Sequence, residues 1–118
     1  MDVIEAIYQR RSIRAFTTEI VTAGLVEQLV SAATQAPSAM NLQSWAFVII
    51  EGREPLQSYS ARAKQHLLDI LDRGSPLFRY RDQLANPAFD IFYGAPLLIV
   101  VTATSDELQS AEDCCLAA

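Results

Sequence analysis

The chain has 118 residues, of which 51% are hydrophobic and 19% charged, and this composition fits one globular domain rather than a disordered segment. Its formal net charge of -5 argues against a nucleic acid or an anionic membrane surface as partner. The longest apolar stretch, residues 95–103, has the length of a strand and is too short to cross a bilayer. Because Asp2 and Glu5 stand where a signal peptide would need a basic start, we expect a cytoplasmic protein.

Two helices are predicted ahead of the first strand. Apolar residues recur at helical spacing over residues 2–10, where Asp2 can cap the N-terminus. After an extended or irregular segment at residues 12–17, a second helix begins with Thr22 as its N-cap. This helix ends before Pro37, because the residue preceding a proline disfavours helix. The apolar stripes are Val3, Ile4, Ile7 and Tyr8 in the first helix, and Leu25, Val26, Leu29, Val30 and Ala33 in the second.

The second half is predicted to alternate strands and helices. Residues 45–50 form a continuously apolar strand, which we expect to be buried on both faces. A third helix has Pro55 in its first turn and runs to about Arg73, with its apolar face on Leu56, Tyr59, Ala63, Leu67, Ile70 and Leu71. Residues 75–94 form a long connection with room for a short helix. A second strand at residues 97–102 leads to a last helix that opens at Asp106 or Ser110.

Cysteine and histidine show neither a metal-binding nor a catalytic pattern. Cys114 and Cys115 are adjacent and cannot link distant segments, and no CxxC spacing exists. The favoured interpretation is two small apolar residues on a partly buried helix. His66 has no second histidine to pair with, so we expect it at the surface.

Three of the nine basic residues fall within five positions, as Arg10, Arg11 and Arg14. A basic spot on an acidic chain indicates a specific small anion, because guanidinium groups present paired donors to a phosphate and Ser12 can add a hydroxyl. Each such charge-assisted hydrogen bond contributes about 1.5–3 kcal/mol. The alternative is a solvated helix C-terminus, where basic residues complement the helix dipole, and composition alone favours this alternative.

A loop of small and polar residues precedes the first strand. Ser38, Asn41 and Gln43 follow Pro37 and could meet the polar edge of a heterocycle or a ribityl chain, with Trp45 as an apolar anchor. The alternative is an ordinary helix-to-strand connection, and the loop on its own favours this alternative.

Taken together, four segments resemble the nitroreductase family of FMN-dependent oxidoreductases, in the family's order. These segments are RRSIRAF at residues 10–16, APSAMNLQSWAFVII at residues 36–50, FDIFYGAP at residues 89–96 and DCCLAA at residues 113–118. The resemblance implies an α+β fold with a mixed sheet flanked by helices, and residues 1–118 as a single nitroreductase-like domain. It also implies a homodimer with FMN at the subunit interface, where hydride from NADH or NADPH passes to a nitroaromatic, quinone or flavin acceptor in a ping-pong cycle.

The resemblance assigns flavin contacts to two groups of residues and assigns no catalytic side chain, because the chemistry belongs to the flavin. Arg10, Ser12 and Arg14 face the phosphate and ribityl chain, and Arg11 is part of the same motif. The second group approaches the flavin from the partner subunit and comprises Pro37, Ser38, Ala39 and Asn41, with Gln43 as a further contact. Ser44 replaces the family's usual proline before Trp45, which puts the tightness of that turn in doubt.

Family members continue beyond Ala118, so the chain is expected to be a piece of a longer protein or an abbreviated relative. Two alternatives to the enzyme therefore stay open. One is a non-catalytic flavin-binding or association module, and the other is a domain whose arginines bind a different phosphate metabolite.

Overall fold

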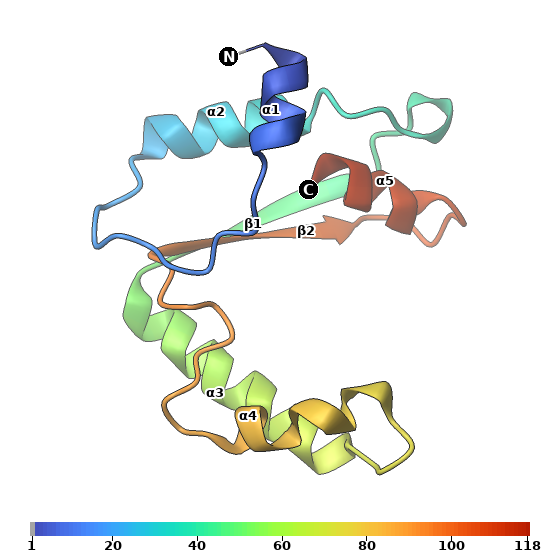
Figure 1. Cartoon of the computed structure of the whole chain (residues 1–118). Coiled ribbons are helices and arrows are strands. Elements are labelled where there is room, and N and C mark those ends of the chain that lie inside the picture. Colours follow the sequence, from blue (N-terminus) through green and yellow to red (C-terminus); the bar gives the residue numbers. More distant parts are fainter. Residues whose placement is uncertain (1) are drawn as a thin grey trace.

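A computed structural model describes residues 2–118. Five α-helices, two short 3₁₀ turns and two strands follow one another along the chain (Figure 1). They are α1 (Val3–Gln9), α2 (Ala23–Ala33), η1 (Ala39–Asn41), β1 (Trp45–Glu51), α3 (Arg53–Ile70), η2 (Pro76–Tyr80), α4 (Arg81–Ala85), β2 (Leu97–Ala103) and α5 (Ser110–Ala117). The predicted α+β class is confirmed.

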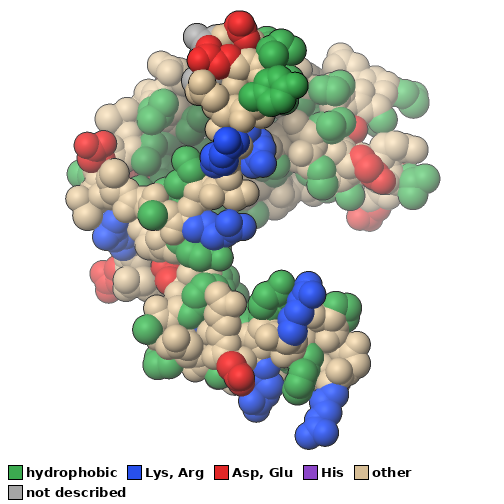
Figure 2. Space-filling view, viewed as in Figure 1, with side chains coloured by type: hydrophobic (Ala, Val, Ile, Leu, Met, Phe, Trp, Pro, Cys, Tyr) green, Lys and Arg blue, Asp and Glu red, His purple; other side chains and the backbone are tan. Residues whose placement is uncertain are grey.

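The two strands form an antiparallel pair along their whole length, from Trp45 opposite Ala103 to Glu51 opposite Leu97. Helices α1, α2 and α5 lie on one side of this pair, whereas α3 and α4 pack together on the other side (Figure 1). The mixed sheet expected from the resemblance needs a parallel neighbour, which residues 2–118 do not supply. The space-filling view shows the surface hollowed between the two groups of helices (Figure 2).

The prediction that the first strand is buried on both faces is wrong for this chain. Side chains alternate between the faces of a strand, so Phe47 and Ile49 share one face and Val48 points to the other. The face with Phe47 lies toward α2 and α5, but Val48 on the opposite face is 48% exposed. Helices α3 and α4 lie on the side of the sheet opposite α2 (Figure 1), and they do not cover Val48.

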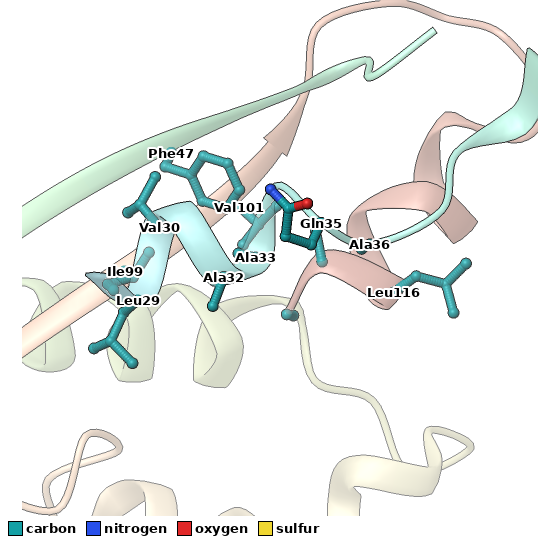
Figure 3. A pocket seen from close by; sticks show the side chains of 12 residues that line it. Leu29, Val30, Ala32, Ala33, Gln35, Ala36, Phe47, Ile99, Val101 and Leu116 are labelled. Atoms are coloured by element: carbon teal, nitrogen blue, oxygen red, sulfur yellow. The ribbon is translucent and has the colours of Figure 1, made fainter. Parts of the chain in front are cut away.

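Even the covered face is loosely packed. Residues of α2, both strands and α5 line a cavity of about 600 Å³, and Figure 3 shows Val30 pointing toward Phe47 while Leu29 points away from the strands. The predicted stripe of α2 is therefore only partly buried, with Val26 covered and Leu29 48% exposed. The Cα radius of gyration of 16.8 Å exceeds the value of about 13.5 Å that compact domains of this length reach. Among residues 2–118 the buried apolar side chains are Val26, Leu56, Leu84 and Ala117.

The helix ends follow local chemistry closely. Asp2 accepts a hydrogen bond from the Glu5 amide at 2.8 Å, and Thr22 caps α2 as predicted. Helix α3 ends at Ile70, three residues before the predicted end, because Leu71 adopts an extended conformation. Of the two predicted starts of the last helix, the structure has Ser110. No helix within residues 2–118 is long and apolar enough to span a membrane.

His66 and the two cysteines lie where the sequence predicts. His66 is exposed on α3, Cys114 is half-buried on α5 and Cys115 is exposed, and both cysteines are free. The described part of the chain contains no group of three His, Cys, Asp or Glu side chains that could hold a metal ion.

Candidate cofactor site

The arginine segment begins where α1 ends, and Figure 2 shows basic side chains gathered there. Arg11 turns back on the helix, because its Nη1 donates to the carbonyl oxygens of Tyr8 and Arg10, each at 2.8 Å. This arginine therefore satisfies carbonyls at the helix C-terminus, which is the structural role that composition had favoured. Arg10, Ser12 and Arg14 are exposed, so a ligand can reach their donors.

Arg14 is set against an aromatic ring from a distant part of the chain. Its guanidinium carbon lies 5.9 Å from the centroid of the Tyr93 ring, within the range of a cation–π interaction. Tyr93 in turn packs edge-on against Phe89, with ring centroids 5.9 Å apart and planes at 81°. The aromatic pair thus gives the exposed Arg14 a defined neighbour.

The carboxylate of Asp90 shapes the turn that carries Tyr93. Its two oxygens accept hydrogen bonds from the amides of Phe92 at 3.0 Å and Gly94 at 2.9 Å. Burial opposes ionisation of Asp90, but these two amides, the Ser60 hydroxyl and the charge of Lys64 outweigh it, so the pKa lies below the ordinary value of 3.8. The same turn holds Tyr93 in the left-handed region, at a φ of 55°.

Two buried polar side chains of α3 support this turn and were missed by the sequence analysis. Lys64, which is 9% exposed, donates from Nζ to the carbonyl oxygens of Asn86, at 3.0 Å, and Phe89. Ser60, 3% exposed, accepts from the Ile91 amide at 3.0 Å.

The predicted apolar face of α3 is accordingly wrong in part. Leu56 is buried, but Tyr59 is 48% exposed and Ile70 is 63% exposed. The inward face instead continues through Ser60 and Lys64. The four-residue spacing of these two residues from Leu56 was the available signal, because it places all three on one side of a helix.

A cavity of about 620 Å³ opens beside the Arg14–Tyr93 contact. Its walls come from the segment after the arginines, from α2, and from the residues that lead into β2. They are predominantly apolar and include Phe16, Ile20, Leu25, Phe92, Tyr93 and Pro96. Arg14 contacts the Tyr93 ring from this wall, and an apolar cavity with a few polar groups is the usual form of a ligand site.

The polar loop before β1 has an unusual backbone. Met40, Asn41 and Gln43 have φ values of 52°, 55° and 51°, in the left-handed region that residues other than glycine rarely adopt. Ser38 closes the loop, because its Oγ accepts from the Gln43 amide at 3.0 Å. Such backbone is characteristic of ligand-contacting loops that the surrounding structure holds in place.

Helix α5 provides one such support through Asp113. Its Oδ1 accepts from the Ala39 amide at 3.0 Å, and the side chain is only 5% exposed. In the sequence, Asp113 only marks the start of a family-like helix. Its loop partner lies 74 positions away, and nothing in the local sequence around Asp113 points to that partner.

Within one chain the two predicted groups of site residues are not brought together. The loop at residues 37–43 lies beyond the N-terminal end of β1, apart from the segment at residues 10–14 below α1 (Figure 1). Pro37, Asn41 and Gln43 are exposed, and Ser38 and Ala39 are half-buried. Each group is thus accessible on its own surface.

Comparisons with known proteins agree on one family. A model described as "Nitroreductase family" matches residues 7–118. A nitroreductase from Bacteroides fragilis, crystallised with bound FMN, superposes with a TM-score of 0.84 at 25% identity over 99% of this chain and 60% of its own. A nitroreductase with bound FMN from Desulfitobacterium hafniense gives 0.78 at 28% identity, over 97% of this chain and 58% of its own.

A curated relative extends the agreement to sequence. The NADH dehydrogenase of Thermus thermophilus is 39% identical over 62 residues, which are 52% of this chain and 29% of that protein. The chain thus spans less than two thirds of the length of each of these relatives. Because the family model covers nearly the whole chain, the chain belongs to the nitroreductase family.

Proposed function

We propose that this chain functions in an FMN-dependent oxidoreductase that takes hydride from NADH or NADPH and delivers it to a nitroaromatic, quinone or flavin acceptor. The observation that carries the proposal is the set of exposed donors Arg10, Ser12 and Arg14, of which Arg14 lies against Tyr93 at the wall of an apolar cavity. The chain's family relatives were crystallised with FMN. When bound, FMN supplies the two-electron chemistry, which amino-acid side chains cannot perform by themselves. The cycle we propose is ping-pong, with donor and acceptor using the same face in turn.

The residues present fit the phosphate of this cofactor. A flavin phosphate carries nearly two negative charges and several acceptor oxygens, which match the planar donors of Arg10 and Arg14. Ser12 adds a hydroxyl between them. Arg11 contributes indirectly, because its guanidinium donates hydrogen bonds to carbonyl oxygens at the C-terminal end of α1, next to this group. In this proposal the chain binds and orients the cofactor, and no side chain acts as a general acid or base.

The second half of the site comes, in this proposal, from a second copy of the chain. Pro37, Ser38, Ala39, Asn41 and Gln43 would then meet the flavin across a dimer interface. Two observations support a dimer. The loop that carries these residues lies apart from the arginine segment of the same chain (Figure 1). The apolar side chains of α1 are also uncovered, with Ile4 62% and Ile7 63% exposed.

The test is turnover by the purified protein after addition of FMN. We expect a yellow protein that oxidises NADH or NADPH when a quinone or nitroaromatic is present. Protein that stays colourless and inactive with excess FMN would contradict the proposal. Tight FMN binding without oxidation of either nicotinamide would instead favour a non-catalytic flavin-binding module. If the protein binds a different phosphate metabolite and FMN competes poorly with it, the arginines belong to a site for that metabolite and not to a flavin site.

A further inference from the structure

We propose that Asp113 is a positioning residue for the cofactor, because it fixes the backbone of the loop at residues 37–43. This inference rests on the proposed function, in which that loop contacts the flavin. It adds a residue outside both groups of predicted contacts.

The geometry ties one buried carboxylate to the start of the loop. Asp113 lies in the first turn of α5. Its Oδ1 receives the Ala39 amide at 3.0 Å, and the side chain is 5% exposed. Hydrogen bonds to an ionised acceptor are roughly twice as strong as neutral ones, and burial strengthens them further.

The loop needs such a restraint. Its three positive φ values lie at Met40, Asn41 and Gln43, immediately after the anchored Ala39. The loop's own hydrogen bonds are short-range, for example from the Gln43 amide to the Ser38 Oγ at 3.0 Å. Short-range bonds hold the loop closed on itself but do not place it relative to the rest of the chain.

The side chains of the loop contribute little to that placement. Met40 is 90% exposed and Leu42 is 51% exposed, so neither packs the loop onto the domain. At the far end the backbone is secured where the Thr104 amide donates to the Ser44 carbonyl at 3.1 Å. Asp113 is the corresponding link at the near end, next to Ser38 and two residues from Asn41. Its loss would let this part of the loop move while β1 remains paired.

The experiment compares three variants by fluorescence titration with FMN and with riboflavin. Asp113→Ala removes the acceptor, whereas Asp113→Asn keeps an oxygen that can accept the Ala39 amide. Ser110→Ala is the matched control, because Ser110 is also buried on α5 but pairs with the Ser105 hydroxyl at 2.8 Å rather than with the loop. Hydrogen exchange at the Ala39 amide gives a readout that needs no cofactor.

We expect Asp113→Ala to lower the affinities for FMN and for riboflavin by the same factor, about tenfold, because in the proposed function the loop contacts the flavin ring and not the phosphate. In Asp113→Ala the Ala39 amide should also exchange faster than in wild type. Asp113→Asn should bind both flavins about threefold more weakly than wild type, because a neutral acceptor forms a weaker hydrogen bond. Ser110→Ala should keep wild-type affinity. If Asp113→Ala does not fold, the comparison of Asp113→Asn with wild type decides by the same two measurements.

Two outcomes overturn the inference and are distinguishable. If the wild-type protein binds FMN, but the Asp113 variants bind both flavins with wild-type affinity, Asp113 does not position the loop for the cofactor. A merely structural role would show this pattern, with lower stability and unchanged flavin affinity. If the wild-type protein binds neither flavin, the proposed function itself fails, and the inference fails with it.

Discussion

The Arg14 guanidinium lies 5.9 Å from the centre of the Tyr93 ring, although 79 positions separate the two residues. The contact matters because Arg14 is exposed and would otherwise sample many conformations. A flexible arginine loses more conformational entropy on binding an anion than one that is already oriented. Tyr93 itself is held by the turn that Asp90, Ser60 and Lys64 support, so the position of Arg14 depends on α3.

Replacing the Tyr93 ring should therefore weaken FMN binding selectively. An exposed cation–π contact contributes about 0.5–1 kcal/mol, so we expect Tyr93→Leu to lower the affinity for FMN about two- to fivefold. Riboflavin, which lacks the phosphate, should bind as before, and Tyr93→Phe should behave as wild type. Tyr80→Leu is the matched control, because Arg79 lies 4.9 Å from that ring in the other part of the molecule. Equal losses for FMN and riboflavin would show that Tyr93 acts other than through Arg14.

Loss of the buried Lys64 should destabilise the protein. Lys64→Ala leaves the carbonyls of Asn86 and Phe89 without their donor and exposes a gap at α3. We expect the free energy of unfolding to fall by about 2–4 kcal/mol, as measured by urea denaturation. Arg62 is an exposed basic residue on the same helix, and Arg62→Ala should change the free energy of unfolding by less than about 0.5 kcal/mol. Similar losses in the two variants would mean that the Lys64 contacts contribute little.

Asp90 makes stability depend on acid pH. Its pKa is lower in the folded protein than the ordinary value of 3.8, so folding favours the ionised form. The stabilisation is therefore complete well above 3.8 and is lost as the pH falls through the folded-state pKa. We expect Asp90→Asn to be less stable than wild type at pH 7, with the difference shrinking as the pH is lowered toward 3. A difference that is constant over this range would contradict the assigned role.

The uncovered face of α1 should govern association. Wild-type protein is expected to scatter light as a particle of twice 13.0 kDa. Ile7→Asp places a charge on the exposed apolar face of α1 and should shift the population to monomer. Ile70→Asp is the control, since Ile70 is 63% exposed, as Ile7 is, but lies at the end of α3. A wild-type monomer, or equal effects of both variants, would contradict association through α1.

The features that could be predicted from the sequence are those with local causes. Asp2 and Thr22 cap helices through amides three residues away, and α2 ends before Pro37. The strand cores were equally predictable, because residues 45–50 and 97–101 are continuous apolar runs of strand length. The exposure of Val48 could not be predicted, because it depends on which helices cover the sheet.

The supports of the site were missed for a different reason. Lys64, Asp90 and Asp113 act on backbone groups, which every residue possesses, so no partner residue type marks the interaction in the sequence. Asp113 reaches Ala39 across 74 positions, and Lys64 reaches Phe89 across 25. The sequence allows a capping role for the whole arginine cluster, and only the structure assigns this role to Arg11.

The most direct test of the central claim, that the arginine segment binds the phosphate of FMN, is a comparison of FMN with riboflavin. Both ligands are titrated into wild type, Arg14→Ala and the charge-matched control Arg79→Ala. We expect wild type and the control to prefer FMN, and Arg14→Ala to lose at least about tenfold of that preference, the value of one charge-assisted hydrogen bond. Equal affinity of the wild-type protein for FMN and riboflavin would contradict the claim.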